Sequence, residues 1–282
     1  MHGTPKKHRS SKIADQHANS LTIRELDTPE EYLQVCEIQS VVWGEPFDDR
    51  VAPNQFTVAR RVGAVLVGAL DDDKVVGFVF SIAGFRDRVP IHWSELMGVM
   101  PDYRNQGMGR QMKLKQRELC LAAGVGHIEW SYDPMVARNA HFNINRLGVA
   151  IIEYIPDFYL STGSKIHTLK MDRTIADWSL DSAGVTERIN ARIAPVSAHD
   201  AAIINNPDGS TELDPLAAGT TVRVEIPADI WAVAADDHDS ANAWQSGVRA
   251  AFTNALAVGF TVTGFFRDSD TGRCFYVLSN TA

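Results

Sequence analysis

The chain has 282 residues, a formal net charge of −8 and 45% apolar residues, enough to bury a core in one large or two small domains. This acidic balance argues against general nucleic-acid binding, which depends on neutralising phosphates. No apolar run is long enough to cross a bilayer, and no apolar segment follows the basic residues near the start, so neither a membrane partner nor a secretory signal is predicted.

Three cysteines, Cys36, Cys120 and Cys274, lie far apart in the chain. Their spacing matches neither a disulfide framework nor a Cys-x-x-Cys metal knuckle. A reducing, cytoplasmic location is therefore the simplest expectation.

Ordered structure is expected from about residue 20, after an N-terminal tail over 1–19 that we predict to be disordered. Residues 21–26 are a strand candidate. Thr28-Pro29-Glu30-Glu31 then forms a capping-box pattern with proline at the first helical position, which predicts a helix as far as Trp43. Residues 46–53 are expected to form a loop.

The next elements alternate between strands and helices. Apolar segments at 64–70 and 75–83 flank Asp71-Asp72-Asp73-Lys74, which indicates a hairpin. A strand at 91–99, a helix at 107–123, a strand at 127–132, a helix at 138–147 and strands at 149–154 and 167–172 follow. This order predicts a mixed α/β domain over residues 20–172.

The remainder of the chain is expected to form a smaller unit. Turn signals dominate 173–220, which predicts an irregular connection with one or two short strands. A strand at 221–226, a helix at 241–258 capped by Ser240, and strands at 260–266 and 274–278 indicate a small α/β C-terminal module over 221–282.

The segment that bears chemistry begins in the strand at 91–99 and ends in the helix after it. Gly107 and Gly109 allow the backbone to approach a ligand closely. The free N–H groups of the loop and of the helix start form an anion site that suits a pyrophosphate. A Walker loop would need Gly-Lys-Ser/Thr where Gly109-Arg110-Gln111 stands, and a dinucleotide fingerprint would need glycine in place of Met112.

The pattern Arg-x-x-Gly-x-Gly at Arg104 to Gly109, after a strand ending in Leu-x-Gly-Val, resembles the coenzyme-A motif of the GNAT superfamily. The resemblance extends over about residues 20–172. The strings Tyr132-Asp133-Pro134, Ala137-Arg138-Asn139-Ala140-His141 and Tyr154-Ile155-Pro156 resemble a little-characterised bacterial branch of GNAT enzymes that carry a C-terminal extension.

This resemblance implies the GNAT fold, with a mixed, mostly antiparallel sheet that splays between two central parallel strands, 91–99 and 127–132. Acetyl-CoA or another acyl-CoA would be the co-substrate. The implied coenzyme contacts are Met97, Gly98 and Val99 for the pantetheine arm, Arg104, Asn105, Gln106, Gly107, Met108 and Gly109 for the pyrophosphate, and Arg110 and Asn139 beside them. Arg104 could instead only anchor the loop. Arg110 and Lys113 could neutralise coenzyme phosphates or simply face solvent.

Amine acylation by a thioester needs a base, a donor for the oxyanion and, in some cases, a proton for the thiolate. Strand alternation places Trp93, Glu95, Met97 and Val99 on one face, which makes Glu95 the candidate base and an ordinary surface glutamate the alternative. Glu129 is a weaker candidate.

The resemblance implies a tyrosine acid four residues before the glycine that ends the helix at 138–147. Ile144 stands at this position. Tyr154 is therefore the candidate proton donor, with Tyr159 or unaided departure of the thiolate as alternatives. His92, His127 and His141 lack ligand spacing, so no metal site is predicted.

Together these features predict an acyl-CoA-dependent N-acyltransferase that moves an acetyl, succinyl or other acyl group to the amine of a small molecule. One alternative is a GNAT module that binds acyl-CoA without catalysis. Another is that the C-terminal module serves interaction or dimerisation through an exposed stripe of Trp244, Val248 and Phe252. The acceptor, the acyl chain and the formation of a homodimer stay open.

Overall fold

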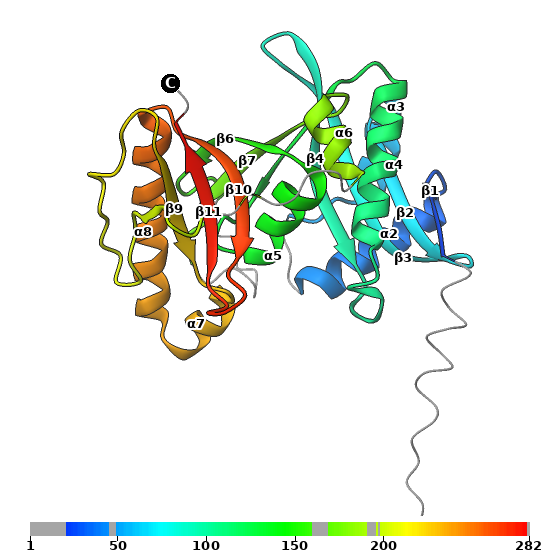
Figure 1. Cartoon of the computed structure of the whole chain (residues 1–282). Coiled ribbons are helices and arrows are strands. Elements are labelled where there is room, and N and C mark those ends of the chain that lie inside the picture. Colours follow the sequence, from blue (N-terminus) through cyan, green and yellow to red (C-terminus); the bar gives the residue numbers. More distant parts are fainter. Residues whose placement is uncertain (1–20, 45–48, 160–168, 191–195, 197, 281–282) are drawn as a thin grey trace, which may run out of the picture. The chain divides into compact units, whose positions relative to one another are not determined.

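The computed structural model describes residues 21–44, 49–159, 169–190, 196 and 198–280, and the chain divides into two units, Met1–Gly124 and Val125–Ala282 (Figure 1). Both units combine helices with antiparallel strands, so the α/β class predicted from the sequence is confirmed. We describe each unit separately.

The first unit contains four antiparallel strands in chain order. They are β1 (Leu21–Glu25), β2 (Val65–Asp71), β3 (Lys74–Arg86) and β4 (Val89–Val99). The predicted hairpin between β2 and β3 is present, and Asp72 adopts a positive φ of 52° in its turn. Short polar residues such as aspartate tolerate this conformation better than most.

Helix α2 (Pro29–Trp43) has the predicted capping box. The Thr28 side chain accepts a hydrogen bond from the Glu31 backbone N–H, and the Glu31 carboxylate accepts one from the Thr28 N–H. Gly44 follows the helix with a φ of 85°, as expected for a residue that stops it.

Helix α3 (Pro53–Arg61) was not predicted, because its N-cap is Ala52, which has no side-chain acceptor. It is held mainly by Phe56, which is fully buried, packs against Tyr32 at a tilted angle and contacts Phe80 edge to ring. Helices α2 and α3 therefore cover one sheet face through a shared apolar cluster that includes Ile38 and Phe78.

Helix α4 (Met108–Ala122) packs on the opposite sheet face. A Cβ built on Gly77 would lie 3.3 Å from Met112 Cε of α4, whereas the next residue of β3, Phe78, belongs to the cluster under α2. Since successive side chains of a strand point to opposite faces, the sheet lies between α4 and the α2–α3 pair. The short 3₁₀ turn η1 (Pro101–Tyr103) precedes α4.

The second unit contains two sheets. The first has the strand order β5 (His127–Tyr132), β7 (Arg173–Ser179), β6 (Ala150–Ile155). The second has the order β10 (Thr261–Arg267), β11 (Cys274–Ser279), β9 (Thr221–Ile226), β8 (Ala202–Ile203). Its helices are α5 (Ala137–Ala140), the π-helical segment η2 (His141–Leu147), α6 (Ala183–Ile189), α7 (Ile230–Asp236) and α8 (His238–Ala257).

The strand predicted at 167–172 is wrong. The strand is Arg173–Ser179, which pairs with both β5 and β6, and residues 169–172 have no strand structure, while 167 and 168 lie outside the described residues. The irregular connection expected from residue 173 therefore begins later. The domain boundary predicted at residue 172 falls just before β7, which belongs to the same sheet as β5 and β6. Strand β7 is buried on both faces along most of its length, so it lacks the polar–apolar alternation that marks a half-exposed strand.

The cap predicted for α8 is also wrong, because the helix begins at His238 and the Asp237 side chain accepts from the Asp239 N–H. Ser240 instead donates its hydroxyl to Asp237. On this helix Val248 and Phe252 are fully buried. The exposed stripe that an interaction platform would require is therefore not present on α8.

The two sheets of the second unit are joined by aromatic and polar contacts. Tyr154 of β6 stacks on Phe252 of α8 with ring centroids 5.3 Å apart. The Tyr276 hydroxyl of β11 donates to the Pro134 carbonyl at 2.8 Å. The C-terminal module predicted from residue 221 thus shares a core with β5, β6 and β7.

Candidate active site

The loop between β4 and α4 has the geometry of an anion site. Asn105 and Gly107 adopt positive φ values of 62° and 80°, and Gly107 is the N-cap of α4. The first hydrogen bonds into the helix come from the N–H groups of Arg110 and Gln111, which both donate to the Gly107 carbonyl at 3.1 and 3.2 Å. The N–H groups of Met108 and Gly109 precede these bonds and are free of intrahelical acceptors.

The electrostatic setting of the loop favours a negative charge. No acidic residue occupies the first turn of α4, so no carboxylate offsets the positive end of the helix dipole. A Cβ built on Gly109 would be 3.7 Å from Met97 Cε, an ordinary contact. The protein itself would therefore accept a methyl group at this position, and the absence of a Cβ leaves the backbone open to close approach by a ligand.

Three side-chain hydrogen bonds fix the loop. The Tyr103 hydroxyl donates to the Asp71 carboxylate at 2.7 Å, and this bond raises the pKa of Tyr103 to about 12. Arg104 Nε donates to the Val99 carbonyl at 3.1 Å, and Gln106 Nε2 donates to the Asp102 carbonyl at 3.2 Å. Of the two roles considered for Arg104, the anchor is thus observed, and its contact with a phosphate stays a prediction.

Lys113 lies inside the unit, although the sequence suggested a phosphate contact or a solvent-facing charge. Its side chain is 3% exposed, and Nζ donates to Ser94 Oγ at 2.9 Å and to Gln116 Oε1 at 3.0 Å. Burial of the ammonium lowers its pKa to about 7. The bond to Ser94 ties the second turn of α4 to β4, directly beside Glu95.

Glu95 is the extra residue of a β-bulge, which the sequence did not reveal. Across β3 and β4, Phe80 pairs with Leu96 and Ser81 pairs with Ser94, so that Glu95 has no opposite partner. Ser94 contacts Lys113 of α4, and Met97 approaches Gly109 of α4.

The bulge changes which side chains of β4 share a face, compared with the prediction from simple alternation. Because Ser94 and Met97 both face α4 although three positions separate them, the simple alternation is broken between them. Trp93 therefore does not share a face with Met97, contrary to the prediction.

The surroundings of Glu95 raise the pKa of its carboxyl group. The residue has an exposed surface, but the protein around its carboxyl removes enough water to raise the pKa. A hydrogen bond from Trp93 opposes this shift, and the negative charge of Asp49 adds to it.

Tyr154 is held as a structural donor. It is 8% exposed, and its hydroxyl donates to the buried Asp172 carboxylate at 2.7 Å. Arg249 completes the arrangement, with Nε 2.9 Å from the same oxygen of Asp172. Burial, followed by the charge of Asp172, raises the pKa of Tyr154 far above its usual value.

Tyr159 has a more accessible phenol. Its side chain is 37% exposed, and its hydroxyl lies 3.0 Å from Ser131 Oγ of β5. The Arg173 guanidinium lies over its ring, 5.4 Å from the centroid. Ile144, at the position where a tyrosine was expected, is buried in η2.

The other candidates fall within ordinary structural settings. Asn139 is half-buried on α5, and Glu129 is buried on β5. The three histidines each have a local polar partner: His92 with Ser81, His127 with Asp177, and His141 with Asn145. Among the described residues, no three side chains of the metal-binding types gather to hold an ion.

The α/β fold and the glycine loop at the start of α4 are the features that the sequence resemblance implied. Residues 24–142 match the family model described as the acetyltransferase (GNAT) family. Residues 24–142 therefore form a domain of the acetyltransferase (GNAT) family, and the chain carries an additional C-terminal region.

Solved structures with a similar fold come from several organisms. The ribosomal-protein-S18-alanine N-acetyltransferase of Escherichia coli is 18% identical, with 58% of this chain and 96% of that one covered at a TM-score of 0.46. Arabidopsis thaliana NAA60 in complex with acetyl-CoA is 12% identical, with 56% and 99% covered at 0.46. A GNAT-family acetyltransferase of Streptococcus pneumoniae is 16% identical, with 56% and 98% covered at 0.45.

No curated protein sequence matches the chain. Among the described helices, none is long and apolar enough to cross a membrane.

Proposed function

We propose that this protein is an acyl-CoA-dependent N-acyltransferase that transfers an acetyl, succinyl or related acyl group to the amine of a small molecule. The observation that carries the proposal is the β4–α4 loop. Its positive-φ residues Asn105 and Gly107 turn the backbone donors of the α4 start outward, with no carboxylate nearby in the first turn. Such a site suits the pyrophosphate of coenzyme A.

The proposed coenzyme contacts are Met97, Gly98, Val99, Arg104, Asn105, Gln106, Gly107, Met108, Gly109, Arg110 and Asn139. The loop residues would hold the pyrophosphate through backbone N–H groups. Because Arg104 Nε donates to the Val99 carbonyl, the Nη groups of Arg104 would bind a phosphate. Acyl-CoA enters as a co-substrate, and the proposal assigns no role to a metal.

In the proposed reaction Glu95 takes a proton from the acceptor ammonium, directly or through water. The freed amine attacks the thioester carbon and forms the C–N bond. The nitrogen gives up its second proton to solvent as the tetrahedral intermediate collapses, and the C–S bond breaks to release the coenzyme thiolate. The raised pKa of Glu95 brings it closer to that of a useful base at neutral pH.

For the proton that the thiolate receives, Tyr159 is the better donor. The Tyr154 proton is directed at Asp172 inside the core, whereas the Tyr159 hydroxyl is accessible. We therefore assign Tyr154 a structural role and Tyr159 the role of proton donor.

Coenzyme binding is tested with Gly109→Ala in the full chain, followed by calorimetric titration with CoA and acetyl-CoA. The added methyl makes only an ordinary contact with Met97, so the melting temperature should stay within about 2 °C. Affinity for CoA should fall by about tenfold or more, because the methyl occupies space beside the phosphate. Gly84→Ala is the matched control, since a Cβ there meets no atom within 4 Å.

If the wild-type chain binds neither CoA species, the proposed function is wrong. If Gly109→Ala binds CoA as well as Gly84→Ala does, the pyrophosphate lies elsewhere.

Catalysis is tested by thiol release with an amine panel. Glu95→Gln should lower kcat by about 10²-fold or more with CoA affinity unchanged. Tyr159→Phe should lower kcat more than Tyr154→Phe, whose main effect should be on stability. CoA binding without turnover on a broad panel, in wild type and Glu95→Gln alike, would instead support a binding module without catalysis, a reading favoured by the buried Ile144.

A further inference from the structure

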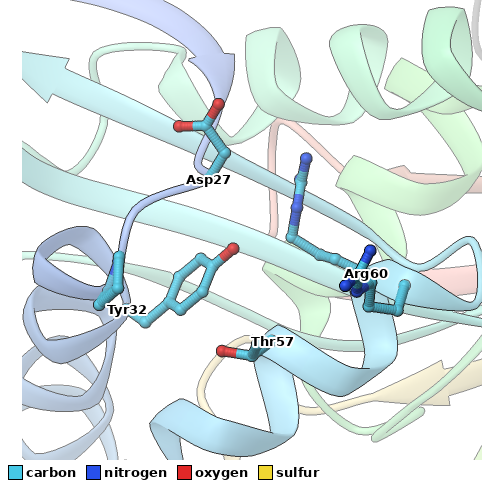
Figure 2. Close-up of a pocket in the computed structure, with 6 residues that line it drawn as sticks. Asp27, Tyr32, Thr57 and Arg60 are labelled. Atoms are coloured by element: carbon cyan, nitrogen blue, oxygen red, sulfur yellow. The ribbon is translucent and has the colours of Figure 1, made fainter.

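A hollow of about 260 Å³ opens in the first unit, where α2 begins and α3 ends (Figure 2). It is lined by Asp27, Pro29, Tyr32, Thr57, Arg60 and Arg61. Its volume lies just below the usual range for sites that hold drug-sized ligands. It therefore suits a ligand with only a few non-hydrogen atoms.

Tyr32 supplies the observation that points to a ligand. Its side chain is 5% exposed and its ring packs against Phe56, with centroids 5.8 Å apart. Figure 2 shows its hydroxyl pointing into the space between Asp27 and Arg60. Within the described part of the chain, this hydroxyl has no hydrogen-bond partner.

The ring is buried, while the hydroxyl itself reaches solvent in the hollow, so an oxygen atom of a ligand can take the place of water there. Burial also raises the pKa of Tyr32, so the group keeps its proton at neutral pH. It can therefore donate a hydrogen bond to whatever occupies the hollow.

The charges around the hollow are balanced and separated. Arg60 Nη1 lies 3.2 Å from Glu25 Oε1, and Arg61 and Asp27 line the opening. The hollow is lined by two arginines and one carboxylate, and Glu25, outside the lining, offsets the charge of Arg60. Arg61 and Asp27 then remain as one cation and one anion for a ligand. A zwitterion matches this pair, because the guanidinium groups and the Tyr32 hydroxyl suit a carboxylate, and Asp27 suits an ammonium group.

The hollow is distinct from the coenzyme loop. Leu21, at the start of β1, pairs with Asp71, and the Asp71 carboxylate holds Tyr103 beside the loop. Asp27 follows the other end of β1, where Leu26 N–H donates to the Leu66 carbonyl at 3.0 Å. The five-residue strand β1 separates the two places by about 16 Å.

We infer that this hollow is a second ligand site, which binds a small zwitterionic α-amino acid independently of acyl-CoA. The carboxylate lies against Arg60, Arg61 and the Tyr32 hydroxyl, with Thr57 beside them, and the ammonium group lies against Asp27.

The test is calorimetric titration of the full chain without any CoA, using L-alanine, propionate and ethylamine as probes. Alanine should bind, whereas propionate and ethylamine, which each carry one of its two charged groups, should bind at least about tenfold more weakly. Tyr32→Phe keeps the core ring and removes only the hydroxyl, and it should weaken alanine binding about tenfold. Arg61→Gln, at an exposed position, should weaken it similarly without affecting folding.

Lys74→Gln removes an exposed cation from the β2–β3 hairpin at the other end of β1, and it is the matched control. No binding of alanine at about 10 mM would overturn the inference. Equal binding of propionate and alanine would reject the role of Asp27, and unchanged binding in both Tyr32→Phe and Arg61→Gln would reject the location.

The outcome is separate from that of the proposed function, because no coenzyme or turnover is involved. Gly109→Ala should bind alanine as the wild type does. Loss of alanine binding in Gly109→Ala would place the amino acid at the coenzyme loop and overturn the assignment to the hollow.

Discussion

The buried Lys113 makes the stability of the protein depend on pH in a direction opposite to that of a salt-bridged lysine. In the unfolded chain its pKa is near 10.5, and in the folded protein it falls to about 7. Between these values the unfolded state holds the proton and the folded state releases it. The free energy of unfolding therefore rises with pH across this window.

The magnitude follows from the two pKa values. Their difference corresponds to about 5 kcal/mol when one pKa unit is worth about 1.4 kcal/mol. Below about pH 7 both states are charged and the full penalty is present; toward pH 10.5 the penalty disappears. Cys120, whose pKa burial raises from 9.0 to about 12, ionises first in the unfolded chain and so lowers the stability above about pH 9. This contribution is common to the wild type and a Lys113 variant, so it cancels when the two are compared.

Lys113→Met removes the charge and keeps a similar length. The variant lacks the charge whose burial destabilises the wild type at low pH. However, Ser94 and Gln116 lose their hydrogen-bond donor, at a cost of about 1–3 kcal/mol. At pH 6 we expect Lys113→Met to be more stable by about 2–4 kcal/mol, and this advantage should shrink by about 1.4 kcal/mol per pH unit above pH 7.

The assay is urea unfolding followed by circular dichroism at pH 6, 7, 8 and 9. Lys115→Met is the matched control, because Lys115 lies on the same helix and pairs with the exposed Glu118 at 2.7 Å; its stability should parallel that of the wild type. A constant difference between Lys113→Met and wild type at all four pH values would refute the reasoning.

Three further substitutions test the packing. Thr28→Ala removes the acceptor for the Glu31 N–H and should destabilise the first unit by about 1 kcal/mol, measured by urea unfolding. Arg249→Met leaves the 1%-exposed Asp172 without its cation and should cost about 3–5 kcal/mol in the same assay; if adding Asp172→Asn recovers none of this loss, the buried charge is not its cause. Gly68→Ala places a Cβ 2.5 Å from Leu26 Cδ2 and should cost about 1–3 kcal/mol, seen as a lower melting temperature; an unchanged value would contradict the close approach.

Local signals predicted much of the fold. The capping box at Thr28 and Glu31, the turn at Asp72 and the glycine after α2 act within a few residues of chain, so their physics is visible in the sequence. The loop from Arg104 to Gly109 belongs to the same group, because backbone freedom at Gly107 and the dipole of the following helix are also local properties.

Helix α3 and strand β7 escaped prediction for a different reason. Helix α3 has no side-chain cap, and it is held by Phe56 against α2 and the sheet. Strand β7 has Thr174, Ile175 and Trp178, which favour strands, but burial on both faces removed the alternation that would have identified it.

The amino-acid sequence by itself determined the α/β class and the glycine loop at the start of α4, because both depend on short-range periodicity and on residues next to each other. Only the tertiary structure decided the surroundings of the candidate catalytic groups. Glu95 became a bulged residue through the register of β3 and β4, Lys113 became buried beside Ser94, and Tyr154 was committed to Asp172 and Arg249. Each of these depends on contacts between distant positions, and desolvation by such neighbours sets proton affinity where sequence order does not.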